Sequence, residues 1–123
     1  MPSRKTHNKI IADLGEQAAE RFLRRVGLRI IERNFRCRSG EIDIIAEEAG
    51  VIVFAEVKTR SPCAVLPPED AVNEDKRRRI KRAAAYYLSN FRDPVPVRYD
   101  IVSVLVDARD AVTEIRHKKD AFR

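Results

Sequence analysis

The chain has 123 residues and a mass of 14.1 kDa, enough for one hydrophobic core and too little for two. Hydrophobic residues make up 44% of it, so we expect a folded domain although 36% of the residues are charged. No apolar run is long enough to cross a membrane, and the basic N-terminus continues into a charged amphipathic segment without a signal-like core. We therefore expect a cytoplasmic protein that has no membrane partner.

The net charge of +6 and the pI of about 9.7 suggest a polyanionic partner, because cationic side chains displace the counterions that phosphates hold. Charge by itself favours nucleic acid only modestly. The two cysteines, Cys37 and Cys63, are far apart, and only two histidines accompany them. This spacing predicts free thiols and no zinc site.

The first element is predicted to be a helix over residues 8–26. Its apolar residues recur at steps of three and four, and Gly27 follows at the position where a helix often ends in a left-handed residue. Three strands are expected next, over residues 28–36, 41–48 and 51–59.

The second half of the chain begins with a predicted loop over residues 61–68, which contain three prolines. A long helix over residues 69–90, a strand over residues 99–106 and a short edge strand over residues 111–116 should follow. The order αβββαβ predicts an α/β fold, with a mixed sheet flanked by helices on both faces.

We expect a single domain over residues 1–123, with a flexible basic N-terminus at 1–8 and a flexible tail at 118–123.

Charged residues lie two positions apart in both central strands. Because side chains alternate across a strand, Asp43 should share one face with Glu41 and Ile45, while Ile42 and Ile44 share the other. Neither an ordinary buried strand nor an ordinary exposed one combines these charges with so many large apolar residues.

A two-residue turn at residues 49–50 would set the pairing of these strands, with Asp43 opposite Glu56 and Glu41 opposite Lys58. Opposed side chains have Cβ atoms about 4.5–5.5 Å apart, and opposed like charges destabilise a sheet. The two carboxylates therefore predict a divalent cation between them, and Mg²⁺ is the simplest candidate because it binds oxygen ligands. Lys58 would point at the same place, where it could neutralise a phosphate or hold a water.

A solvated hairpin face explains the same pattern, with Glu41 and Lys58 forming an ordinary cross-strand ion pair. A one-residue slip in register would also remove the carboxylate pair. Three large apolar residues share the charged face and favour a covered site: Ile45, Ile52 and Phe54.

Asp43 followed by Glu56-Val57-Lys58 is similar to the D…ExK signature of the PD-(D/E)xK nuclease superfamily. A larger set of residues resembles the YraN-like family of small, largely uncharacterised bacterial proteins, which is placed beside Holliday-junction resolvases by fold. This set comprises Gly15-Glu16, Arg33-Asn34, Arg36, the segments GEIDII and FAEVKTR, Lys76 and the segment RYD at 98–100. The resemblance covers residues 11–106 and implies a restriction-endonuclease-like core.

The resemblance also implies an active site. Mg²⁺ or Mn²⁺ would be bound by Asp43, Glu56 and the backbone carbonyl of Val57, with Lys58 as the catalytic lysine. Glu16, on the first helix, would contribute to the same site. The implied reaction is hydrolysis of DNA phosphodiester bonds, with branched DNA suggested by the resolvases, and a homodimer is compatible with the resemblance.

The chain departs from the family pattern away from these residues. Residues 64–67 stand where relatives tend to have an aromatic-glycine pair, Ala12 stands where a glycine is usual, and Tyr99 replaces a common phenylalanine. The conformation of the 61–68 loop is therefore not predicted by the resemblance.

The candidate nucleic-acid contacts are basic, and residues 74–82 place six cations on one predicted helix. A solvated helix face is the ordinary explanation of such a run, and a surface that follows phosphates is the alternative. The candidates are Arg36, Arg60, Lys76, Arg78, Arg79 and Arg82. Tyr86 and Tyr87 are interpreted as core and rim residues rather than as platforms for bases.

The leading hypothesis is a metal-dependent DNA endonuclease, and the alternative is a non-catalytic nucleic-acid-binding protein on a nuclease fold. The first predicts a metal-dependent product, and the second predicts binding that survives loss of Asp43 or Glu56. A structural or partner-docking protein, a third hypothesis, would bind neither metal nor DNA.

Overall fold

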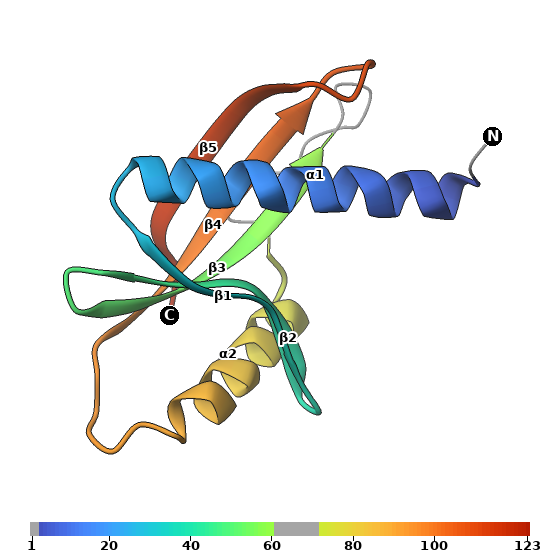
Figure 1. Ribbon diagram of the computed structural model, residues 1–123. Helices are drawn as coiled ribbons and strands as arrows, with labels where there is room; N and C mark the ends of the chain where they lie inside the picture. Colours follow the sequence, from blue (N-terminus) through green and yellow to red (C-terminus); the bar gives the residue numbers. More distant parts are fainter. Residues whose placement is uncertain (1–2, 61–71) are drawn as a thin grey trace.

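The computed structural model describes residues 3–60 and 72–123, and within them two helices and five strands follow the order αβββαββ (Figure 1). The elements are α1 (Arg4–Arg25), β1 (Arg29–Cys37), β2 (Gly40–Glu48), β3 (Val51–Arg60), α2 (Glu74–Leu88), β4 (Val97–Val106) and β5 (Val112–Phe122). The predicted α/β class and αβββαβ order are confirmed, and β5 extends them. Neither described helix combines the length and apolarity that a bilayer crossing would need.

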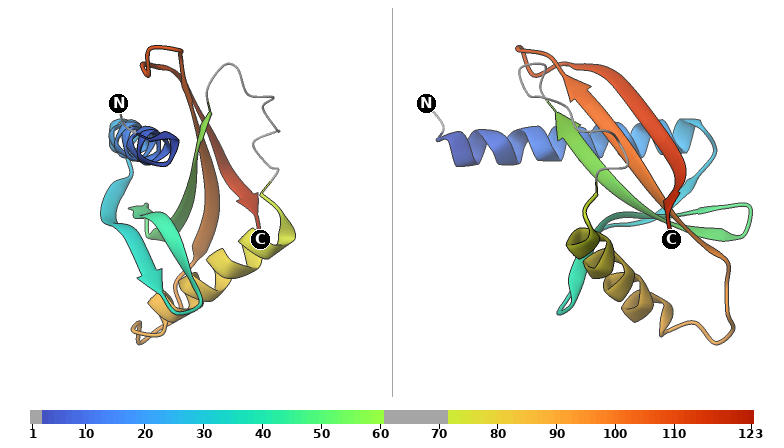
Figure 2. Two further views of the ribbon diagram at one scale, coloured as in Figure 1. Left: turned by 90° about the vertical axis from the view of Figure 1, so that its right-hand side faces the viewer. Right: turned by 180° about the vertical axis from the view of Figure 1, so that it is seen from behind.

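The strands form one mixed sheet in the order β1-β2-β3-β4-β5. Strands β3 and β4 are parallel because the chain crosses over through α2 between them, and all other neighbours are antiparallel. Helix α1 lies on one face of the sheet and α2 on the other (Figure 2). The hydrophobic core is therefore divided into two clusters, one under each helix.

Helix α1 begins earlier than predicted. The Ser3 side chain accepts a hydrogen bond from the Thr6 N–H at 3.1 Å, and this N-cap starts the helix at Arg4. The predicted flexible N-terminus is thus wrong for residues 4–8. At the other end Gly27 has a φ of +105° and ends the helix as predicted.

Helix α2 is shorter than predicted and begins at Glu74. Asn73 is its N-cap and accepts a hydrogen bond from the Lys76 N–H at 2.9 Å, so Val72 precedes the helix instead of lying on its stripe. Val72 is still buried in the cluster under α2. The predicted loop at 61–68, the start of the predicted helix and Cys63 lie outside the described residues.

The β2–β3 hairpin has the predicted turn. Ala49 and Gly50 both have positive φ, as a tight two-residue hairpin turn requires, and Glu48 pairs with Val51. The register is the predicted one and continues to Ile44 opposite Ala55, where the pairing ends.

Beyond this point β1 and β2 twist away from β3 and run toward α2 (Figure 1). Asn34 has a φ of +53°, which interrupts the alternation of side chains along β1. On the paired strand β2, Ile44 lies opposite Arg33 and packs in the cluster under α1, whereas Ile42 lies opposite Phe35 and packs in the cluster under α2. The prediction that Ile42 and Ile44 share a face is wrong, because the hairpin twists here and brings them under different helices.

The C-terminal segment is a strand to its end. Strand β5 runs to Phe122, which is only 6% exposed and stacks on Tyr99 with ring centroids 5.0 Å apart. The predicted flexible tail is therefore wrong for residues 118–122. Their sequence, KKDAF, lacks strand alternation, and pairing with β4 overrides that weak local preference.

Candidate active site

The candidate site lies where β2 separates from β3. Asp43 and Glu56 continue the register of the hairpin one step beyond its last pair. The Asp43 Oδ2 atom accepts a hydrogen bond from the Val57 N–H at 2.8 Å, so this side chain stays against β3 after the backbone pairing has ended. The structure thus brings together Asp43, Glu56 and Val57, as the sequence predicted.

The surroundings of the two carboxylates disfavour their charged forms. Glu56 is buried, and Asp43 is half-buried. Burial and the neighbouring Glu56 raise the pKa of Asp43 to about 7. Burial likewise raises the pKa of Glu56, although Lys76 opposes the shift. Two neighbouring carboxylates with raised pKa values make this place a candidate functional site, because perturbed pKa values cluster at such sites.

Lys76 approaches Glu56 from α2. Its Nζ lies 3.5 Å from Glu56 Oε1, and its side chain is 33% exposed. The sequence predicted Lys76 as a nucleic-acid contact and missed its pairing with Glu56. This pairing could have been predicted from the position of Lys76 on the apolar stripe of α2, because a cation on a buried face needs a partner inside the fold.

Lys58 follows Glu56 by two residues on β3 and is half-buried. Burial is the main cause that lowers its pKa, with Arg60 contributing, while the nearby Glu56 acts in the opposite direction. The predicted pairing of Glu41 with Lys58 is wrong, because the strands have already separated. Glu41 instead forms an ion pair with Arg36 of β1 at 3.2 Å.

Glu16 reaches the site from α1. Burial and the proximity of Asp43 raise its pKa. Its Oε1 is buried and has no hydrogen-bond donor among the described residues, although Arg33 Nη2 lies 3.6 Å away. Gly15 makes this approach feasible, because a Cβ there would lie 1.9 Å from Thr59 Oγ1 on β3. Glu16 therefore lies near Asp43, and its role in a metal site stays a prediction.

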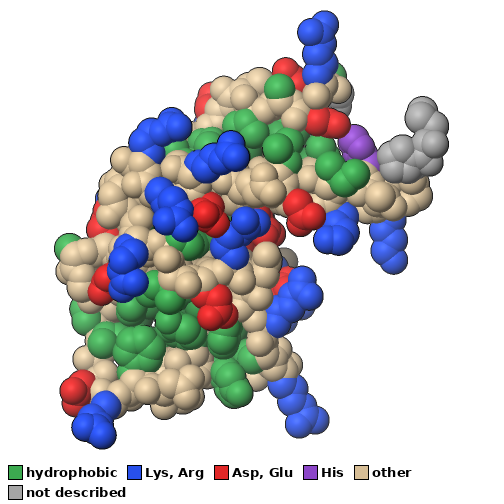
Figure 3. All heavy atoms as spheres, viewed as in Figure 1, with side chains coloured by type: hydrophobic (Ala, Val, Ile, Leu, Met, Phe, Trp, Pro, Cys, Tyr) green, Lys and Arg blue, Asp and Glu red, His purple; other side chains and the backbone are tan. Residues whose placement is uncertain are grey.

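The predicted basic contacts do not gather into one surface. Arg36, Lys76 and Arg79 line a hollow of about 330 Å³ between the β1–β2 turn and α2, together with Arg38, which the sequence analysis missed. Figure 3 shows Lys and Arg side chains spread over the viewed face with Asp and Glu among them. The other predicted contacts, Arg60, Arg78 and Arg82, are not in this lining.

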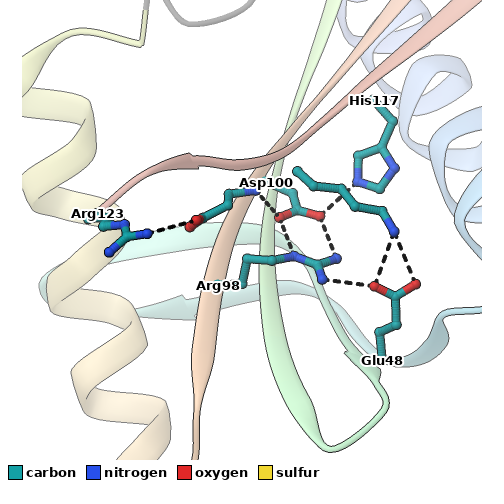
Figure 4. Close-up of polar contacts among 7 residues, drawn as sticks. Glu48, Arg98, Asp100, His117 and Arg123 are labelled. Atoms are coloured by element: carbon teal, nitrogen blue, oxygen red, sulfur yellow. Dashed lines mark hydrogen bonds and ion pairs between the residues drawn. The ribbon is translucent and has the colours of Figure 1, made fainter.

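A second buried polar cluster was not predicted at all. Asp100 of β4 is fully buried, and its carboxylate accepts hydrogen bonds from Arg98 Nε at 2.8 Å and from the Asp120 N–H at 3.0 Å (Figure 4). His117 Nε2 lies 2.7 Å from it, and Arg98 also donates to Glu48. The sequence did contain a sign of this cluster: strand alternation places Asp100 on the same face as Val102 and Val104, where a buried acid needs partners. The cluster joins β2, β4 and β5 and is fully paired, so we interpret it as structural.

Comparison with known proteins decides the family. The model of the family described as "Uncharacterised protein family UPF0102" matches residues 15–104. The chain belongs to the UPF0102 family. This is the YraN family that the sequence motifs predicted.

UPF0102 proteins from several bacteria are similar over most of their length. One from Geotalea daltonii is 43% identical over 96% of this chain and 93% of its own. One from Caldicellulosiruptor bescii is 42% identical over 93% of this chain and 98% of its own. A third, from Symbiobacterium thermophilum, is 50% identical over 76% of this chain and 80% of its own. The UPF0102 match includes Glu16, Asp43, Glu56 and Lys58.

Proposed function

We propose that this UPF0102 protein is a divalent-metal-dependent endonuclease that hydrolyses phosphodiester bonds of DNA. The observation that carries the proposal is the pair of carboxylates formed by half-buried Asp43 and buried Glu56 where two strands separate. The resemblance of Asp43 and Glu56-Val57-Lys58 to the PD-(D/E)xK signature supports it.

The residues present fit a divalent cation. Among the described residues no three His, Cys, Asp or Glu side chains lie close enough to form a metal cluster, so the ligands would be Asp43, Glu56, the Val57 carbonyl and water. Mg²⁺ commonly takes one or two carboxylates with waters and substrate phosphates. Accepting the Val57 N–H also leaves Asp43 with unused lone pairs. Mg²⁺ or Mn²⁺, when bound, would act as a Lewis acid and activate a water for in-line attack.

The other side chains have separate roles in this proposal. Lys58 provides a half-buried cation beside the carboxylate pair and would stabilise the negative charge that develops on the phosphate. Glu16 lies beside Asp43 and would orient water at the α1 side of the site. Lys76 neutralises Glu56 in the metal-free protein.

Cleavage assays test the proposal directly. Linear, flapped and four-way DNA would be incubated with Mg²⁺ or Mn²⁺ and with the wild type, Asp43→Ala or Lys58→Ala. We expect each variant to lose activity by about a hundredfold or more, because each removes a charge that the transition state requires. The exposed substitution Glu114→Ala should leave the rate unchanged. Wild-type cleavage that both site variants retain would overturn the proposal.

A nucleic-acid-binding protein without turnover is the second candidate. The Lys76–Glu56 ion pair favours it, because it satisfies one of the carboxylates without a metal. This candidate predicts DNA binding that is unchanged by Asp43→Ala and no product with either metal. A rise in melting temperature with Mn²⁺ that Asp43→Ala abolishes would argue against it.

A further inference from the structure

We propose that one face of α2 carries a single strand of nucleic acid from the carboxylate pair to Tyr86, with a phosphate in the hollow at Arg79 and a base on the Tyr86 ring. The inference rests on the proposed function and names the form of its substrate. It is carried by three features that occur in order along the helix: Lys76, then the hollow, then an exposed aromatic ring.

The hollow has the size and charge of a phosphate site. It encloses about 330 Å³, and four cationic side chains line it: Arg36, Arg38, Lys76 and Arg79. Among the described residues of the lining Glu41 is the one acid, and it is paired with Arg36. The remaining cations give the hollow a net positive charge, which attracts phosphate groups.

The hollow is a built feature of the fold. At Gly40 the β1–β2 turn approaches α2 so closely that a Cβ would lie 2.5 Å from the Arg79 carbonyl oxygen. Ile80, only 2% exposed, lies in the lining and anchors α2 in the core. The two walls are thus held together by backbone packing, and the arginines project from fixed positions.

Lys76 connects the hollow to the candidate active site. Its side chain lines the hollow, while its Nζ lies 3.5 Å from Glu56. A phosphate bound at Arg79 would therefore lie one helical turn from the residue that touches the carboxylate pair. A strand held there would have a neighbouring phosphodiester within reach of Asp43 and Glu56.

Tyr86 provides the second contact. Its side chain is 60% exposed, whereas Tyr87 belongs to the cluster under α2. Tyr86 follows Arg79 by seven residues, so both lie on the same side of the helix and about 10 Å apart along its axis. Phe35 of β1 lies beside it, with ring centroids 6.3 Å apart, and supports the exposed ring.

A basic groove followed by an exposed ring is typical of proteins that bind single strands, because every unpaired base has a face that can stack. A duplex keeps its bases stacked inside and would use the cations but not the tyrosine. The sequence favoured core and rim positions for Tyr86 and Tyr87 over a role as platforms for bases, and the exposed ring of Tyr86 revises this interpretation for that residue.

Binding measured without metal tests this inference. Fluorescence anisotropy would compare a labelled single-stranded oligonucleotide with a duplex of the same length in EDTA. We expect Arg79→Gln and Tyr86→Ala each to weaken single-strand binding at least fivefold, and Tyr86→Ala to leave duplex binding within twofold. The salt dependence should distinguish the two variants. Arg79→Gln should lower the slope of log K against log[salt] by about 0.7, because it removes one phosphate contact, whereas Tyr86→Ala should leave this slope unchanged.

Matched variants control for charge and folding. Tyr86→Phe keeps the ring and should bind as the wild type does, and Arg109→Gln removes an exposed cation in the β4–β5 turn and should change affinity less than twofold. Equal losses for Arg109→Gln and Arg79→Gln, or no loss for Tyr86→Ala, would overturn the inference. Displacement of the oligonucleotide by inorganic phosphate or a mononucleotide at micromolar concentration would also overturn it, in favour of a small phosphate ligand.

The outcome is separable from that of the proposed function. Asp43→Ala should retain the single-strand binding, because the α2 face does not include this carboxylate. Single-strand binding without any cleavage would support this inference and contradict the proposed nuclease activity. Cleavage that does not depend on Tyr86 would support the nuclease activity and contradict this inference.

Discussion

The carboxylate of Asp43 lies where a charge is costly for the fold. It is half-buried, close to Glu56 and fixed by the Val57 N–H. The nearby cation that the structure provides, Lys76, contacts Glu56 at 3.5 Å. Asp43 is therefore under local electrostatic strain. Such strain at a single position is the usual compromise between stability and function.

Replacement of Asp43 by Asn should make this strain measurable. The pKa of Asp43 in the folded protein is raised from 3.8 to about 7, so the stability that its neutral form provides at low pH is lost as the pH rises through this range. At pH 8 without divalent metal we expect Asp43→Asn to be more stable than the wild type by about 1–3 kcal/mol. The difference should shrink toward pH 4.

Urea unfolding at pH 4, 6 and 8 would measure the effect, with Glu114→Gln as an exposed control. A variant that is less stable than the wild type at pH 8 would contradict the assignment of electrostatic strain to Asp43.

At the scale of elements, one residue in β1 decides how the hairpin is shaped. The left-handed backbone of Asn34 turns Arg33 toward α1, where it pairs with Glu16, and turns Phe35 toward α2, where it packs on Tyr87. The hairpin can therefore leave β3 and reach α2. Both the opening at Asp43 and the hollow depend on this change of direction.

Two substitutions at Asn34 isolate the role of its backbone. Both Asn34→Gly and Asn34→Ala lose the interaction of this side chain with Glu16, but only glycine adopts positive φ without steric cost. We expect Asn34→Ala to be less stable than Asn34→Gly by about 1–2 kcal/mol in denaturant unfolding. Equal stability of the two variants would show that the left-handed conformation carries no cost at this position.

The molecule as a whole contains two acidic clusters that lie close together in its sheet. Asp43 and Glu56 lie where β2 and β3 separate, whereas Asp100 lies opposite Ala55, the residue before Glu56, and ties β4 to β5 and to Glu48 at the end of β2 (Figure 4). In the first, Lys76 pairs with Glu56 and the Val57 N–H donates to Asp43, and in the second several hydrogen bonds and ion pairs hold Asp100. We therefore expect the Asp100 cluster to act mainly on stability.

The Asp100 cluster should govern the stability of the whole molecule. Burial tends to raise the pKa of Asp100, but hydrogen bonds from His117, Arg98 and the Asp120 N–H outweigh it, so the pKa is lowered. The stabilisation is therefore present above the ordinary aspartate value and lost as the pH falls below it. We expect Asp100→Asn to cost about 3–5 kcal/mol at pH 7, because it removes one of the two carboxylates paired with half-buried Arg98 and the charge that His117 and the Asp120 N–H contact.

Thermal and chemical unfolding would measure this loss, with the exposed substitution Asp93→Asn as the control. The cost of Asp100→Asn relative to the wild type should shrink as the pH falls from the ordinary aspartate value of 3.8 toward the lower pKa of folded Asp100, while Asp93→Asn should match the wild type throughout. A loss that is unchanged by pH would assign the effect to packing instead of charge.

Much of this protein follows from its sequence, because the deciding interactions are local or periodic. Strand alternation and the turn at Ala49-Gly50 determine the register that brings Asp43 to Glu56. The motifs around Gly15-Glu16 and GEIDII determine the UPF0102 family. Helix periodicity predicts both helices, and their ends follow from caps such as Ser3 and Asn73, which pattern analysis overlooked.

Only the tertiary structure decided the rest, because it depends on contacts between residues far apart in the chain. Ile42 and Ile44 pack under different helices, and Glu41 pairs with Arg36 instead of lying opposite Lys58. Lys76 meets Glu56 only when α2 packs on the sheet. Three further features also depend on residues that are distant in the sequence and could not be predicted from it: the hollow, the Asp100 cluster and the strand at residues 118–122.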